Sequence, residues 1–165
     1  MAKSYYSTVF DQSADAFWNV IRDFNNYPVW VDGAGTSHIE GGKTGDTVGA
    51  IRDVLYKDMR RRQRLLALSD AERSQTYEFA GEALLPVQNF QATIRVTPIV
   101  DGGRAFVEWW TTFDCEPAVR EERVAFFGDA FAGWLESLRR HLLHVAPRSG
   151  ETEDALTPPS PSRAA

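Results

Sequence analysis

The sequence predicts an α+β fold in which an antiparallel sheet of about seven strands curves around one long C-terminal helix. Three observations lead to this prediction. An amphipathic stretch spans residues 117–145, several segments of alternating strand character precede it, and two short helical segments separated by turn residues follow the first strand. The strands together then form a surface that receives the apolar face of the helix.

The stretch over residues 117–145 is the element around which the chain is organised. Its apolar side chains recur at steps of three and four, so they share one face of a helix. They are Val124, Phe127, Phe131, Trp134, Leu135, Leu138, Leu142 and Val145. Pro117 suits the first helical turn. Small residues beside this stripe, Ala125, Gly128 and Ala132, indicate open volume next to the helix, or close packing of the helix on a sheet.

The N-terminal part predicts a strand over residues 3–10, where aromatic and β-branched side chains alternate. Asp11 or Ser13 can cap the helix that follows. Its apolar side consists of Ala16, Phe17, Val20, Ile21 and Phe24. Two asparagines and Pro28 then break the helix, which predicts an aromatic-rich elbow over residues 23–30.

The middle of the chain predicts further strands, separated by turn residues. Their ranges are 36–40, 47–56, 60–69, 73–80, 89–100 and 104–115. The glycines at 41, 42 and 45 indicate a hairpin turn, because the segment lacks the Lys-Ser/Thr ending of a phosphate-binding loop. Arg60, Arg61, Arg62 and Arg64 are interpreted as a solvated strand end.

Composition excludes several function classes. A net charge of −5 and a pI near 5.2 argue against a nucleic-acid-binding surface. The single Cys115 excludes an intramolecular disulfide and a cysteine-rich metal site. His38, His141 and His144 do not have the spacing of a ligand set, so we expect neither a metal nor a cofactor. His38 is expected at the surface or at a sheet edge.

No stretch approaches the roughly 20 apolar residues of a membrane span, and the N-terminus lacks a signal-peptide pattern. We therefore expect a cytoplasmic protein that is a monomer or a weak homodimer. One domain over residues 1–146 is expected, followed by a disordered proline-rich tail over residues 147–165.

Four segments carry a resemblance to a known family. They read AFWNVIRDF at 16–24, YPVW at 27–30, GDTVGAIR at 45–52 and VEW at 107–109. Over residues 3–145 the chain resembles the START/Bet v 1-like (SRPBCC) superfamily, with its closest local match in the polyketide cyclase/dehydrase-like subgroup. The resemblance implies a helix-grip fold with an internal cavity. Related families bind lipids, isoprenoids, plant hormones or aromatic polyketides in that cavity.

Arg52 is the clearest polar candidate for such a cavity, because it interrupts an alternation of apolar residues that includes Val48 and Val54. A buried guanidinium there would bind a carboxylate or polarise a carbonyl. Alternatively, Arg52 forms an ion pair with Glu78 or Glu108, or is exposed at a strand edge.

Aromatic residues complete the candidate site. Tyr27 and Trp30 lie at the elbow, where the resemblance places the cavity entrance, although either could simply fill the core. Tyr77 could add a hydrogen bond if its strand face points inward. The facing apolar stripes place the cavity between the long helix and the sheet. Its expected lining is Phe127, Phe131, Trp109 and Phe113.

Two functions follow. The first is binding of a hydrophobic or amphipathic small molecule, such as a lipid, an isoprenoid or an aromatic polyketide-like compound. The second is a cofactor-independent polyketide cyclase/aromatase-type enzyme, a lyase or cyclase. In that enzyme Arg52 would polarise a carbonyl, and Tyr27 or Tyr77 would transfer the proton. The first is favoured, since no catalytic pair is recognisable.

Overall fold

The computed structural model describes residues 1–81 and 85–145. The predicted domain end at residue 146 and the predicted tail over residues 147–165 lie outside these described residues.

The described chain forms one antiparallel sheet of seven strands, as the sequence predicts. The strands lie in the order β1-β7-β6-β5-β4-β3-β2, so every pair except β1–β7 consists of sequential neighbours. Their bounds are Ala2–Phe10 (β1), Ala34–Ile39 (β2), Ile51–Tyr56 (β3), Met59–Ser69 (β4), Ser74–Phe79 (β5), Gln88–Ile99 (β6) and Arg104–Asp114 (β7). Asp101 and the two following glycines turn the chain between β6 and β7, and an Asp-Gly pair is typical of such a hairpin turn.

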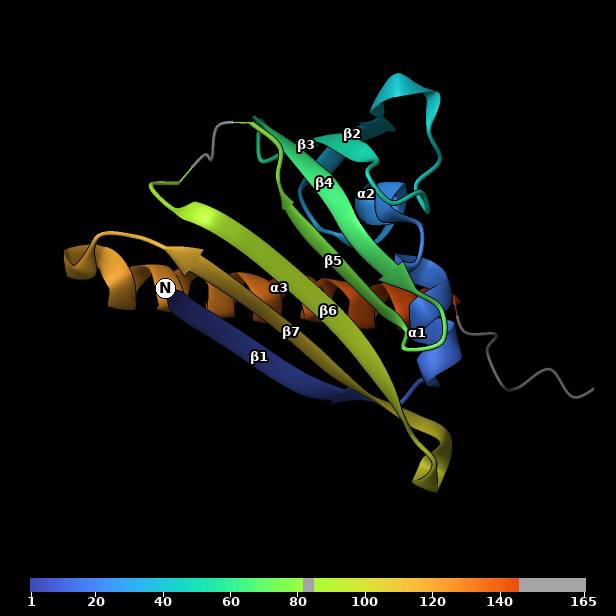
Figure 1. Cartoon of the computed structure of the whole chain (residues 1–165). Helices are drawn as coiled ribbons and strands as arrows, with labels where there is room; N and C mark the ends of the chain where they lie inside the picture. The colour runs from blue at the N-terminus through green and yellow to red at the C-terminus, as the bar shows by residue number, and fades with distance from the viewer. Residues whose placement is uncertain (82–84, 146–165) are drawn as a thin grey trace, which may run out of the picture.

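The long helix α3 (Arg120–Val145) lies along one face of the sheet, behind β1, β7 and β6 in the view of Figure 1. A short 3₁₀ turn, η4 (Pro117–Val119), precedes it. Val145 is exposed because the helix ends there, whereas five apolar side chains of the predicted stripe are buried. They are Phe127, Phe131, Leu135, Leu138 and Leu142. This arrangement is the helix-grip fold expected from the sequence.

The segment between β1 and β2 covers the C-terminal half of α3 (Figure 1). It contains α1 (Ala14–Ile21), η1 (Phe24–Asn26) and α2 (Tyr27–Trp30). Ser13 caps α1 by accepting a hydrogen bond from the Ala16 amide at 3.2 Å. Ser137 of α3 holds α2, since its hydroxyl donates to the Trp30 carbonyl at 2.5 Å and accepts from the Asp32 amide at 2.9 Å.

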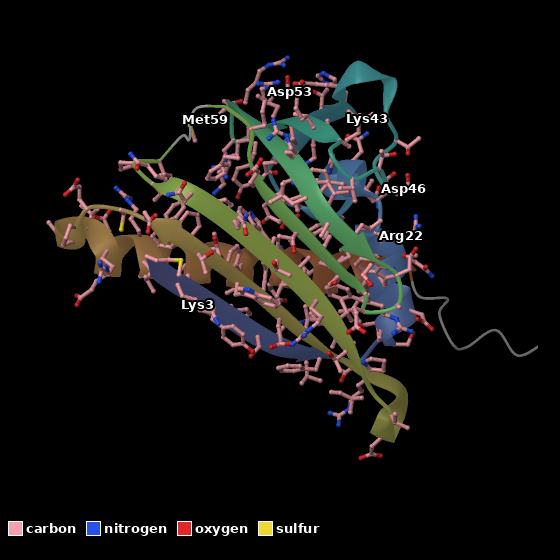
Figure 2. The ribbon with its side chains drawn as sticks, viewed as in Figure 1. Lys3, Arg22, Lys43, Asp46, Asp53 and Met59 are labelled. Carbon is pink, nitrogen blue, oxygen red and sulfur yellow. The ribbon has the colours of Figure 1, made fainter. Side chains whose placement is uncertain are left out.

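One predicted boundary was wrong. The strand expected over residues 47–56 begins only at Ile51, because residues 44–50 form successive turns closed by the bonds Thr47 N to Thr44 O and Ala50 N to Thr47 O. Gly45 of this loop packs against the Asp23 side chain so closely that a Cβ would lie 1.8 Å from the carboxylate. Arg22 lies beside Asp46 of the same loop in Figure 2 and forms an ion pair with it at 3.2 Å.

Candidate functional site

A cavity of about 480 Å³ lies between α3 and strands β4, β5 and β6. We call it the α3 cavity. The helix contributes Phe126, Phe127, Asp129, Ala130, Phe131 and Trp134, and the sheet side contributes Tyr56, Lys57, Met59, Arg61, Gln63, Tyr77, Phe79, Leu85 and Phe90. Its volume is within the range of about 300–1,000 Å³ that is usual for small-molecule sites.

Burial separates a deep end from a mouth. The buried lining residues Tyr56, Gln63, Tyr77, Phe90, Phe127 and Phe131 form the deep end. The exposed residues Lys57, Met59, Phe126 and Asp129 form the mouth. Met59 begins β4 at the β3–β4 turn and is labelled at the upper left of Figure 2. A ligand would therefore pass between this turn and the N-terminal half of α3.

Side chains alternate between the two faces of β4, and this alternation divides the four arginines that were predicted to be solvated together. Arg60, Arg62 and Arg64 point to the outer face, where they form ion pairs with Asp53, Glu40 and Glu78 respectively. Arg61 has the opposite parity and shares the inner face with Gln63 and Leu65, so it lines the cavity. The interpretation of Arg61 as a solvated residue was therefore wrong. The buried Leu65, two positions from Gln63, is the signal that could have revealed this.

Arg61 is half-buried at the wall of the cavity, with its guanidinium carbon 4.7 Å from the centre of the Tyr56 ring. Its Nε is buried without a hydrogen-bond partner, and the described residues form no ion pair with it. A guanidinium in this state retains donors for an incoming acceptor.

Arg52 of β3 is almost fully buried, behind the cavity wall. Nη1 donates to the Phe24 carbonyl at 2.6 Å, Nη2 donates to Oε1 of Gln63, and the guanidinium carbon lies 3.9 Å from the centre of the Phe24 ring and 4.4 Å from that of Tyr27. Burial lowers the pKa of Arg52 to about 10. The alternative ion pairs of Arg52 with Glu78 and Glu108 do not form. Arg52 is on the buried face of the sheet, whereas these two carboxylates are on the outer face and pair there with Arg64 and Arg95.

The Arg52 contact fixes the orientation of the Gln63 amide. Arginine only donates, so the side-chain oxygen of Gln63 must face it and the amide nitrogen is directed elsewhere. Gln63 lines the deep end of the α3 cavity, which makes its N–H₂ group a donor for a ligand oxygen. Arg52 thus reaches the cavity through Gln63.

Two tyrosines near Arg52 differ in position. Tyr77 lines the deep end, and burial raises its pKa to about 12, against the opposing effect of the Arg52 charge. Tyr27 is buried outside the lining, and burial raises the pKa of its phenol above its ordinary range. Both phenols are therefore protonated at neutral pH, which suits donation and not proton abstraction.

The other predicted site residues divide between the lining and a layer behind it. Phe127 and Phe131 line the cavity, whereas Trp109 stacks on Phe131 at 4.8 Å between ring centres and Phe113 packs on Phe127 at 5.0 Å. Trp30 packs against Trp109 at 6.3 Å. This second aromatic layer supports the rings that face the cavity.

The small residues of α3 decide between the two alternatives that the sequence left open for them. The lining includes Ala130, but neither Gly128 nor Ala132. A Cβ at Gly128 would lie 3.5 Å from Oγ of Ser4, so this glycine permits close approach of α3 to β1. Of the two alternatives that the sequence left open, Gly128 therefore follows close packing of the helix on the sheet, and the prediction that Gly128 and Ala132 border open volume was wrong.

The histidines lie away from the cavity. His38 is exposed on the edge strand β2, as expected, and His144 lies at the end of α3, where Nδ1 is 2.6 Å from the Arg140 carbonyl. Within residues 1–81 and 85–145, no group of three or more potential metal ligands is present. No helix in this part of the chain has the length and apolar character needed to cross a membrane.

The sequence matches the family model described as "Polyketide cyclase / dehydrase and lipid transport" over residues 1–144. The chain belongs to this family. The fold and the internal cavity are consistent with this membership, and the resemblance seen in the sequence motifs is confirmed.

Solved structures share the fold over most of the chain. The protein XoxI from Bacillus cereus is 27% identical, with a TM-score of 0.76 over 90% of this chain and 100% of its own. An uncharacterised protein from Bacillus thuringiensis is 27% identical, with a TM-score of 0.75 over 86% of this chain and 99% of its own.

A more distant neighbour is the di-domain ARO/CYC protein BexL, which is 15% identical with a TM-score of 0.75. The match covers 89% of this chain but 48% of BexL, so the chain spans about half the length of that protein. This likeness shows the fold alone. No curated protein matches the sequence significantly.

Proposed function

We propose that this protein binds a hydrophobic or amphipathic small molecule in the α3 cavity. The observation that carries the proposal is the cavity itself, whose wall is mostly aromatic and whose deep end holds the polar groups of Gln63 and Tyr77. An apolar wall with a few directed polar groups is the usual composition of a small-molecule site. Membership of a family described as acting in polyketide cyclisation and lipid transport supports the same function.

Binding of the neutral fluorescent probe phenylnaphthylamine tests this function. The wild-type protein should enhance its fluorescence with saturation. Ala130→Trp fills the cavity and should weaken binding by about tenfold or more. Ala125→Trp is the matched control, because Ala125 is exposed on the same helix and lies outside the lining. Absence of saturable binding to the wild type, or equal binding by a folded Ala130→Trp variant, would contradict the proposal.

A second candidate is a cyclase, favoured by the pair of donors at the deep end. Gln63 and Tyr77 lie on one face of adjacent strands, since Gln63 pairs with Phe79 and Leu65 pairs with Tyr77. The two donors would hold a ketone oxygen and stabilise its developing negative charge during an aldol-type ring closure, in which the attacking methylene, acidified by its two flanking carbonyls, loses its proton to solvent water. Arg52 strengthens this polarisation through Gln63, and the neutral Tyr77 phenol supplies the proton.

Incubation with a synthetic poly-β-ketone thioester tests the cyclase. Liquid chromatography with mass spectrometry should show a ring-closed, dehydrated product whose yield falls by about a hundredfold in Tyr77→Phe. Tyr5→Phe, a change on the exposed outer face, serves as control. A product distribution equal to that of the uncatalysed reaction would leave binding as the function.

A further inference from the structure

We propose that Arg61 is the anion-recognition residue of the α3 cavity and that the ligand is an amphipathic oxyanion. Its carboxylate or phosphate would lie on the Arg61 guanidinium, and its apolar body would extend along Phe127 and Phe131. This inference rests on the proposed binding function and specifies the class of ligand.

The pairing pattern of β4 is the first argument. Each outward arginine of this strand has a carboxylate partner on a neighbouring element, at 2.5 to 2.7 Å. Arg61 alternates with them and has none among the described residues. Its Nε is buried and has no hydrogen-bond partner. A buried donor in this state costs free energy unless another group accepts its hydrogen bond.

Ring stacking positions this guanidinium. The Arg61 guanidinium carbon lies 4.7 Å from the centre of the Tyr56 ring, and the Tyr56 hydroxyl accepts a hydrogen bond from Trp134 Nε1 at 3.0 Å. Tyr56 and Trp134 both line the cavity, so the guanidinium is placed at its wall by side chains that are themselves fixed. A planar guanidinium held in this way suits the two oxygens of a carboxylate.

The charge distribution gives the second argument. The protein carries a net charge of −5, yet the lining of the α3 cavity contains two cations, Lys57 and Arg61, and one carboxylate, Asp129. The buried Arg52 adds a third positive charge behind Gln63, and no carboxylate of residues 1–81 or 85–145 forms an ion pair with it. The cavity is therefore locally positive, which favours an anionic ligand over a neutral one of the same shape.

Asp129 is the protein group that opposes this assignment. It lies on α3, exposed at the mouth, and forms no ion pair with Arg61 among the described contacts. Its carboxylate would compete with a ligand for Arg61 if the two approached. Asp129→Asn should therefore strengthen binding of an anionic ligand.

Two probes that differ by one charged group test the proposal. Anilinonaphthalene sulfonate is phenylnaphthylamine with an added sulfonate, so the ratio of their dissociation constants reports recognition of the anion. Arg61→Met should weaken binding of the sulfonate probe by about tenfold or more and leave the neutral probe within about twofold. Added salt should weaken only the anionic probe.

Arg60→Met is the matched control. Arg60 is adjacent in sequence but lies on the outer face with Asp53, so its replacement removes the same charge without touching the cavity. Displacement of phenylnaphthylamine by dodecanoic acid, dodecyl phosphate and dodecanol then distinguishes a carboxylate from a phosphate ligand. Either acid should compete better than the alcohol in the wild type, and this preference should disappear in Arg61→Met.

The outcomes separate this inference from the proposed function. If neither probe binds the wild-type protein, both fail. If both probes bind and Arg61→Met weakens them equally, or weakens neither, the cavity is a binding site but Arg61 does not recognise an anion. If Arg60→Met weakens binding of the sulfonate probe as much as Arg61→Met does, the assignment is also overturned. The effect would then come from the net charge of the protein and not from the position of Arg61.

Discussion

Arg52 of β3 donates a hydrogen bond to Oε1 of Gln63 on β4, and this contact joins a buried cation to the polar end of the α3 cavity. The two residues are directly paired in the register of the sheet. Arg52 therefore affects the cavity through an intermediate side chain, whereas the sequence suggested direct contact with a ligand.

Replacement of Arg52 should destabilise the protein, because two buried hydrogen-bond acceptors lose their donors. Arg52→Met removes the donors to the Phe24 carbonyl and to Gln63, and each unsatisfied buried acceptor costs about 1–3 kcal/mol. Loss of the buried charge offsets part of this cost. We expect a fall of about 2 kcal/mol in the free energy of unfolding, measured in urea.

The double variant Arg52→Met with Gln63→Leu tests the origin of that fall. It removes one orphaned acceptor, so it should be more stable than the sum of the two single variants predicts. Arg64→Met, which breaks only the exposed pair with Glu78, should change stability by less than about 1 kcal/mol. Additive effects of Arg52→Met and Gln63→Leu would show that the two side chains are not coupled.

The fold could be predicted closely because its signals are periodic. The steps of three and four in α3 and the alternation in β6 and β7 determine which faces are buried, and both patterns persist over many residues. The first residue of β3 was harder to predict, because the turns at residues 44–50 depend on Gly45 packing against Asp23. That contact joins segments that are distant in sequence.

The cavity lining could be predicted only in part. Phe127 and Phe131 follow from helical periodicity, but whether Trp109 lies in the lining or behind it depends on ring packing across the core. Arg61 was assigned to solvent because its neighbours in sequence are charged. The alternation of side chains along the strand, however, places Arg61 on the same face as the buried Leu65. A charged run on a strand is therefore better divided by alternation before it is assigned to solvent.

The stability of the protein in acid should depend on Asp70, a residue of the β4–β5 turn that binds side chains of α1 and its C-terminal end. Its carboxylate accepts from Arg22 Nε at 2.6 Å and from Trp18 Nε1 at 2.8 Å, and these bonds, with Arg22 the larger cause, lower its pKa from 3.8 to about 2. A depressed folded-state pKa contributes stability that is present above the unfolded value and is lost as pH falls.

Thermal unfolding measured between pH 5 and pH 2 tests this dependence. Stability of the wild type should decrease as the pH falls from about 3.8 to about 2, and Asp70→Asn should be less stable at pH 5 and show a shallower decrease. Asp58→Asn at the exposed β3–β4 turn is the control. Parallel pH profiles for Asp70→Asn and the wild type would contradict the prediction.

Tyr77 should control part of the alkaline behaviour, in the opposite direction. Its folded-state pKa of about 12 is above the ordinary value of 10.0, mainly because burial disfavours the phenolate. The folded protein then keeps a proton that the unfolded chain releases, so this contribution to stability is complete below pH 10 and is lost as pH rises to about 12. Two pKa units correspond to about 2–3 kcal/mol.

Ultraviolet titration of tyrosinate, together with urea unfolding between pH 9 and pH 12, measures this effect. In Tyr77→Phe, one late-titrating phenol should disappear and the alkaline loss of stability should be shallower than in the wild type. Comparing the two proteins isolates Tyr77, because the opposing contribution of Arg52 and the parallel one of Tyr27 are present in both. Unchanged late titration in Tyr77→Phe would mean that this phenol ionises at its ordinary pKa, which would contradict the prediction.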